Sequence, residues 1–267
     1  MAFTDKVADP VFDSVLEIPT SGDPSHNAML TITLRYKLNL ADGKNATPGI
    51  IVQREGAAKA RDGEGFLHSI DDWNDKLREN YKKAIWRAEK IWNLKFMLVP
   101  PLDYDGLDFK HPHPGWTVRP NVMCLFRMEC GGVPHLSISA VRPNDPAPFV
   151  NNTARVAPRN MVLDDQAPWR PTLGHELGHA LGMRHIKTML GDARCTADDN
   201  ANRCYGETEH ELANIMGSGR ELWPLNAQPW LERIEVHTGV RASRWTASLD
   251  MKKGPQIIGA GKSLLDI

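Results

Sequence analysis

The sequence predicts an α+β fold in which a twisted mixed sheet packs against one long helix and a second, shorter helix. Three observations support this prediction. Apolar residues occupy every second position of the stretch 28–40, which is typical of a half-buried strand. From Ser69 to Asn93 they recur at three- and four-residue spacing, which indicates an amphipathic helix. The segment from Pro171 to Leu181 is predicted as the second helix, because proline suits a first helical turn.

The remaining elements follow from shorter patterns. Ser69 is the predicted N-cap of the long helix, with Asp71 and Asp72 in its first turn. Stretches rich in glycine, proline or aspartate predict two loops, at residues 41–65 and 101–120. Apolar runs predict further strands at residues 94–99, 121–129, 133–142 and 155–163. A last amphipathic pattern predicts a helix at residues 228–238.

No linker divides the 267 residues, so we expect residues 1–267 to form a single domain. Its upper part, at about 28–182, contains the sheet and the shorter helix. Its lower and irregular part lies at about 183–246, and a tail without periodicity follows at 247–267.

The composition argues against several kinds of partner. Charged residues make up 24% of the chain and the formal net charge is -1, so we expect neither nucleic acid nor an anionic membrane surface as a partner. No apolar run reaches the length of a membrane span. The stretch from Met1 to Glu17 lacks the hydrophobic region of a signal peptide. We expect a monomer, and we favour secretion or delivery by a non-classical route over a cytoplasmic location.

The shorter helix carries a pattern that is typical of a catalytic metal site, His175-Glu176-x-x-His179-x-x-Gly182-x-x-His185. His175 and His179 are four residues apart and therefore project from the same face of a helix. Gly182 permits the left-handed turn that returns His185 to the metal as a third ligand. Three protein ligands leave one position open, as in catalytic zinc sites. Glu176 can reach water at the metal without itself becoming a ligand.

A second segment, Asn214-Ile215-Met216-Gly217, follows about thirty residues after His185. The long histidine motif followed by a methionine in a tight turn resembles the metzincin clan of zinc peptidases. The resemblance implies a metzincin-like fold, one catalytic Zn²⁺, and a Met216 side chain that supports the ligands from below. Ile186 and Ser218 differ from the residues expected in the familiar metzincin families, so the family is left unassigned.

The resemblance also implies a zinc-dependent endopeptidase that acts on protein or peptide substrates. Glu176 would act as general base toward a metal-activated water and pass the proton to the leaving amine. An extended substrate would pair with an edge strand, for which residues 133–142 are the candidate. Two alternatives remain open: a zinc-containing binding module without turnover, and a zinc amidase that cleaves a non-protein amide such as a cell-wall crosslink.

The cysteines and one histidine loop give further expectations. Cys195 and Cys204 flank a polar segment that can close into a disulfide loop, which would favour an oxidising destination. Cys124 and Cys130 are too far apart along one strand to pair with each other. His111 and His113 are candidates for a second, structural metal together with nearby aspartates, but we favour an ordinary surface loop. These aspartates are Asp103, Asp105 and Asp108.

Overall fold

The computed structural model describes residues 3–19, 25–44, 51–53, 58–154, 159–196 and 199–259. The chain forms two compact units, each made of separate stretches of sequence. The first unit contains residues 1–33, 92–127 and 223–267, and the second contains residues 34–91 and 128–222. Both sides of the predicted division near residue 182 lie in the second unit. The prediction of a single domain stays a prediction.

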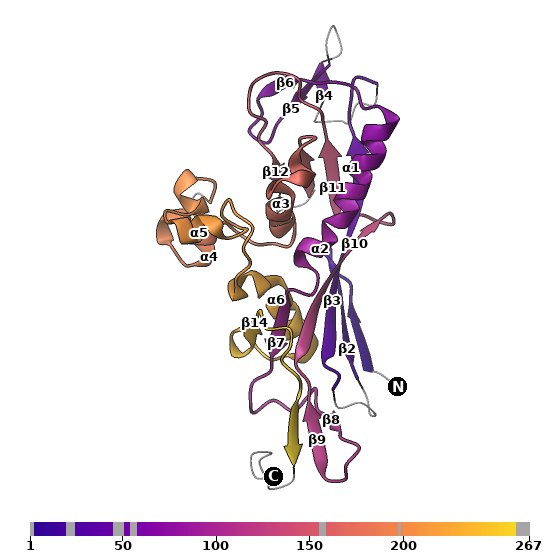
Figure 1. Ribbon diagram of the computed structural model, residues 1–267, viewed down its shortest axis with the longest axis vertical. Helices are drawn as coiled ribbons and strands as arrows, with labels where there is room; N and C mark the ends of the chain where they lie inside the picture. The colour runs from indigo at the N-terminus through magenta and orange to yellow at the C-terminus, as the bar shows by residue number, and fades with distance from the viewer. Residues whose placement is uncertain are drawn as a thin grey trace. The chain divides into compact units, whose positions relative to one another are not determined.

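The second unit is built on a mixed sheet (Figure 1). The central strand is β11 (Leu136–Ala140), which pairs in parallel with β13 (Asn160–Leu163) and with the last residues of β3 (Ala28–Leu40). The short strand β12 (Asn152–Thr153) pairs antiparallel with β13 and ends the strand order on that side. The expected edge strand at 133–142 is therefore wrong, because β11 has hydrogen-bonded neighbours on both sides.

A small antiparallel sheet and several helices complete the second unit. The small sheet has the order β4-β5-β6, with bounds Ile51–Gln53, Lys59–Arg61 and Leu67–Ser69. Helix α3 (Thr172–Ala180) contacts β12, beside which it is drawn in Figure 1. The remaining helices of this unit are α1 (Asp75–Arg87), α2 (Glu89–Trp92), whose last residue belongs to the first unit, α4 (Ile186–Met189), α5 (Glu209–Ala213), η1 (Ala167–Trp169), η2 (Ala193–Cys195) and η3 (Asn202–Tyr205).

The long helix begins later than predicted. Ser69 is not its N-cap, because Ser69 belongs to β6 and the backbone of the next two residues pairs with other segments. The actual N-cap is Asn74, whose side-chain oxygen accepts a hydrogen bond of 2.9 Å from the backbone N–H of Leu77. Tyr81 and Ile85 are fully buried on this helix, so the predicted apolar face is confirmed.

The first unit contains the N-terminal and C-terminal stretches. Strand β2 (Asp13–Ile18) pairs antiparallel with β1 (Phe3–Val7) and with the first half of β3. Strand β7 (Phe96–Val99) pairs antiparallel with β10 (Val122–Cys130) and with β14 (Thr246–Ser248). A separate three-stranded sheet of this unit has the order β15-β9-β8, with bounds Gln256–Gly259, Trp116–Arg119 and Phe109–Lys110. The helices of this unit are η4 (Pro224–Ala227), α6 (Gln228–Thr238) and η5 (Ala242–Arg244).

Some of the predicted helices, strands and loops agree with the structure and others do not. The fold class is confirmed as α+β with a mixed sheet, and the bounds of β3 and α6 match the predicted ones. The expected loops and the tail are wrong in part, because short strands occur within them. Strand β15 pairs with the distant β9, whereas β4 with β5 and β8 with β9 are local pairs of strands that are too short to show a periodicity. Within the described residues, no helix is long and apolar enough to cross a membrane.

Candidate metal centre

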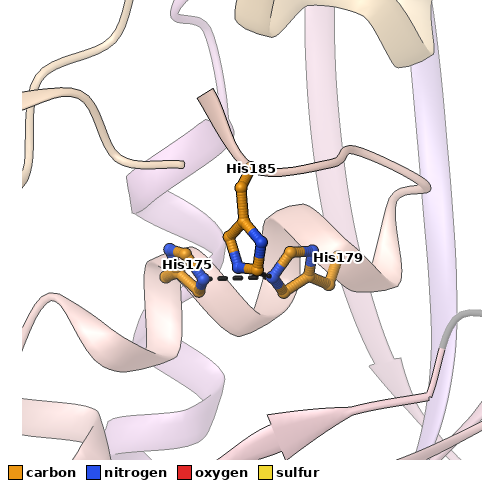
Figure 2. Close-up of side chains that lie close together, drawn as sticks. All are labelled: His175, His179 and His185. Carbon is orange, nitrogen blue, oxygen red and sulfur yellow. Dashed lines mark hydrogen bonds between the residues drawn. The ribbon is translucent and has the colours of Figure 1, made fainter. Parts of the chain in front are cut away.

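Helix α3 places the first two histidines of the motif. It begins after Pro171 and ends at Ala180, with Leu181 as C-cap, as the sequence predicts to within one residue. Gly174 permits this helix to pack closely: a Cβ atom there would lie 2.9 Å from Cδ1 of Ile215 and 3.1 Å from Cγ2 of Ile91. Close packing on this side leaves His175 and His179 projecting together from the other side of the helix, as Figure 2 shows.

Gly182 turns the chain back toward the helix. Its φ is +95°, a left-handed conformation that glycine adopts without steric cost. The Met183 N–H donates to the Gly178 carbonyl and the Gly182 N–H to the His179 carbonyl, at 3.0 Å and 2.9 Å. These two bonds form a Schellman motif, which ends the helix. The turn brings His185 over the other two histidines (Figure 2).

The three imidazoles converge on one point. Nε2 of His179 lies 3.0 Å from Nε2 of His175 and 3.1 Å from Nε2 of His185. All three side chains are buried. Within the described part of the chain, they form the group of metal-ligating side chains whose ligand atoms gather closely enough to hold one ion.

The other nitrogen of each ring points to a backbone carbonyl. Nδ1 of His175 contacts the Ile215 carbonyl at 2.8 Å, and Nδ1 of His179 contacts the Met183 carbonyl at 2.9 Å. Nδ1 of His185 is bound to the Asp199 carbonyl. A carbonyl only accepts, so each Nδ1 must donate and each neutral ring presents a lone pair on Nε2. Three such lone pairs facing one another suit a bound cation, because two acceptors cannot hydrogen-bond to each other.

Burial favours the neutral form of the first ring. Removal from water and, after it, the neighbouring imidazole of His185 together lower the pKa of His175 to about 4. A metal ligand must be unprotonated, so this environment prepares the ring for coordination. The residues present therefore fit a metal ion.

Glu176 lies beside the first ligand and has an incomplete set of partners. The side chain is 5% exposed, and its Oε2 atom has no hydrogen-bond partner among the described residues. Burial raises the pKa of Glu176 to about 7, and the nearby Thr153 hydroxyl opposes that rise. A buried carboxylate oxygen without a protein partner is costly, so its retention calls for a functional explanation.

The predicted methionine turn borders the site. The Met216 side chain is fully buried, and its carbonyl accepts a hydrogen bond of 3.0 Å from the Ile186 N–H, next to the third histidine. Gly217 cannot carry a side chain here, because a Cβ atom would lie 2.6 Å from the Glu211 carbonyl oxygen and 2.7 Å from that of Tyr205. The turn therefore lies against the ligands through its backbone. Support of the metal by the Met216 side chain stays a prediction.

A cavity of about 320 Å³ opens beside the first ligand. Its lining includes residues that the sequence alone did not single out, namely Tyr205 and Arg170. The Tyr205 ring centroid lies 3.8 Å from that of His185 and 5.7 Å from that of His175. The only local signal for Tyr205 is its position next to a cysteine. The full lining is Asn151, Arg170, Pro171, Thr172, His175, Glu176, Tyr205, Gly217 and Ser218.

The second candidate metal site does not gather its ligands in the same way. His111 and His113 lie in a loop whose histidines bond to local backbone and pack against Trp116. Among the described residues, the ligand atoms of these two histidines and of the nearby aspartates do not lie close enough together to hold one ion.

The predicted disulfide is present in the structure. Cys195 and Cys204 form a disulfide with a Cα–Cα distance of 5.6 Å, and both residues are buried. Cys124 and Cys130 are free. Disulfides are typical of proteins in oxidising compartments, so the bond is a weak indication of an extracytoplasmic location.

Comparisons with known proteins give no relative from which a function can be transferred. No protein-family model, no curated protein and no solved structure matches this chain.

Proposed function

We propose that this protein is a zinc-dependent endopeptidase. The observation that carries the proposal is the Oε2 atom of Glu176, which is buried with no hydrogen-bond partner in the described part of the chain, in the wall of a cavity that His175 also lines. A purely structural metal site has no use for an unpartnered carboxylate next to its ligands. The resemblance of the two motifs to the metzincin clan supports the same reaction class.

The ligand set favours zinc over other metals. In catalytic zinc sites that keep a fourth position open, the protein ligands are commonly three neutral imidazoles. The other nitrogen of each ring is bonded to an acceptor, as the three Nδ1 atoms are here to backbone carbonyls. Calcium and magnesium prefer oxygen ligands, and none of the three converging ligand atoms is oxygen. Zinc supplies Lewis-acid polarisation and lowers the pKa of water that it binds.

The residues of the chain would supply the remaining chemistry. Glu176 would take a proton from the attacking water and later donate it to the leaving amine. Burial of this carboxylate excludes competing solvent. The strand beside the cavity is β12, which contacts α3 and follows the cavity residue Asn151. We therefore propose that an extended substrate lies along β12, in place of the stretch 133–142 expected from the sequence.

Glu176→Gln tests the base assignment directly. The amide cannot take the proton, so we expect the variant to retain bound zinc while hydrolysis falls by about 10²–10⁴-fold. Metal content by mass spectrometry and cleavage-site mapping on a proteome-derived peptide library measure the two effects. Glu209→Gln is the matched control, because Glu209 is an exposed glutamate in the first turn of α5.

The outcomes separate the proposed function from its alternatives. If parent and variant both bind zinc but neither cleaves any peptide or casein, the binding module is favoured. Cleavage of peptidoglycan without cleavage of peptides would indicate the amidase. A Glu176→Gln protein that hydrolyses peptides at the parent rate would show that the assigned base is wrong.

We also propose that the protein acts in an oxidising compartment, on the basis of the Cys195–Cys204 disulfide. Counting free thiols by mass spectrometry in protein recovered from its natural location tests this. We expect two free thiols, those of Cys124 and Cys130. Four free thiols would contradict the proposed location.

A further inference from the structure

The third histidine ligand has a support that the motif does not explain. We propose that the stretch of residues 195–205, which contains the Cys195–Cys204 disulfide, positions His185 through Asp199, and that Asp199 is a positioning residue for metal binding. This inference rests on the proposed metal site. His185 needs such support more than the other two ligands do, because it lies beyond the end of α3, at the N-cap of the four-residue helix α4.

Asp199 holds His185 through both its backbone and its side chain. The Asp199 carbonyl accepts a hydrogen bond from Nδ1 of the imidazole. Its Oδ1 atom accepts from the backbone N–H of His185 at 3.3 Å, and its Oδ2 atom lies 3.6 Å from Nδ1. Both side chains are buried. Asp199 therefore helps to orient the ring through two contacts, and the bond to Nδ1 raises the basicity of Nε2.

The Asp199 carboxylate is itself fixed in place. Its Oδ1 atom also accepts a hydrogen bond from the Thr188 hydroxyl, which extends from α4. The same hydroxyl approaches the Cys195 carbonyl at 3.4 Å. Thr188 thus ties the carboxylate to the first cysteine of the disulfide, and the three groups lie around one buried point behind the imidazole.

The other end of the stretch contacts the same histidine. Cys204 closes the disulfide, and the next residue, Tyr205, places its ring 3.8 Å from that of His185. The stretch therefore reaches the imidazole at two positions, Asp199 and Tyr205. A covalent bond between residues nine apart limits how far these positions can move away from His185.

Substitution of Asp199 tests the inference in the full-length oxidised protein. Asp199→Ala keeps the backbone carbonyl that accepts from Nδ1 but removes the carboxylate that accepts from the His185 backbone N–H, so we expect Zn²⁺ binding to weaken by about 10-fold. Asp199→Asn keeps an oxygen that can accept from Thr188 and from the His185 N–H, so we expect at least partial rescue. Competition with a chromophoric chelator measures zinc affinity. Co²⁺-substituted protein adds a readout of ligand geometry, because its visible absorption should change in Asp199→Ala.

Asp192→Asn is the matched control. Asp192 is an aspartate at the start of the same region, but it bonds to Arg194 and makes no hydrogen bond with His185. We expect its zinc affinity and Co²⁺ spectrum to equal those of the parent. A double variant, Cys195→Ser with Cys204→Ser, should weaken zinc binding in the same direction as Asp199→Ala, because it opens the stretch.

The results distinguish an error in the proposed metal site from an error in the role of Asp199. A parent protein that binds neither Zn²⁺ nor Co²⁺ would contradict the proposed function itself. A parent that binds zinc, together with an Asp199→Ala variant of unchanged affinity and Co²⁺ spectrum, would overturn only the role of Asp199. Should Asp199→Ala fail to fold, Thr188→Val decides, because loss of the hydroxyl removes a tether of the carboxylate. Parent-like affinity and Co²⁺ spectrum in that variant would then overturn the inference.

Discussion

The buried histidines of the metal centre and the buried His68, all in the second unit, have different hydrogen-bond partners. In the metal centre, each Nδ1 donates to a backbone carbonyl and the Nε2 atoms of His175, His179 and His185 face one another. His68 instead lies between two carboxylates. Its Nε2 is 3.1 Å from Oδ2 of Asp62, and its Nδ1 is 3.1 Å from Oδ1 of Asp145.

The comparison shows that the second partner decides what a buried imidazole does. Burial lowers the pKa of His175, and no carboxylate bonds to its ring, so the ring is neutral. Burial also acts to lower the pKa of His68, but hydrogen bonds to Asp145 and Asp62 raise it above its ordinary value. The two carboxylates therefore favour the protonated form of His68, which joins β6 to the stretch before β12, whereas the triad is suited to a metal ion.

The largest expected effect comes from removing one of the three converging ligands. His179→Ala leaves two imidazoles, which cannot complete the site, so we expect loss of both bound zinc and hydrolysis. Metal analysis of protein from zinc-replete medium measures this. His113→Ala is the control, because His113 is an exposed histidine outside the triad. Retention of one zinc per chain in His179→Ala would contradict the assignment of the three histidines as the metal ligands.

The next effect should come from the other histidine group and should spare the metal. His68→Ala leaves the buried Asp62 carboxylate without its cation, so we expect a loss of about 3–5 kcal/mol in the free energy of unfolding. Urea denaturation measures the loss. Folded His68→Ala should still bind one zinc ion per chain. Loss of zinc from the folded variant would mean that the two histidine groups are not independent.

Substitutions of Met216 test whether packing of its side chain supports the metal centre. Its side chain is fully buried, so Met216→Ala should cost about 2–5 kcal/mol through the void that it creates. Met216→Leu nearly conserves volume and should cost less than about 1.5 kcal/mol. Thermal melts with and without chelator compare the two variants. A parent-like melting temperature for Met216→Ala would remove the methionine from the support of the site.

The smallest expected effect is a pH dependence that belongs to His68. A raised histidine pKa contributes stability that is present below about 6.5 and lost as the pH rises through the folded value. The lowered pKa values of Asp62 and Asp145 contribute stability above about 3.8 that is lost on acidification. The difference in unfolding free energy between the parent and His68→Gln should therefore be larger at mildly acidic pH than at alkaline pH. An equal difference at both would contradict the ion pair.

Local patterns were sufficient for several elements and for the identity of the candidate ligands. The alternation in β3 and the amphipathic pattern of α6 predict the bounds that these elements have. The spacing of His175, His179 and His185 predicts their convergence, because the helical repeat and the conformational freedom of Gly182 are properties of the residues themselves.

Tertiary structure alone decided the features that depend on distant partners. The carbonyls of Ile215, Met183 and Asp199 orient the three imidazoles, and a backbone acceptor leaves no mark in the sequence. The central place of β11, the N-cap at Asn74 and the position of Tyr205 likewise follow from pairing and packing between remote segments. His68 is the clearest case: only folding places it between Asp62 and Asp145, and those two carboxylates raise its pKa instead of leaving the ring to a metal ion.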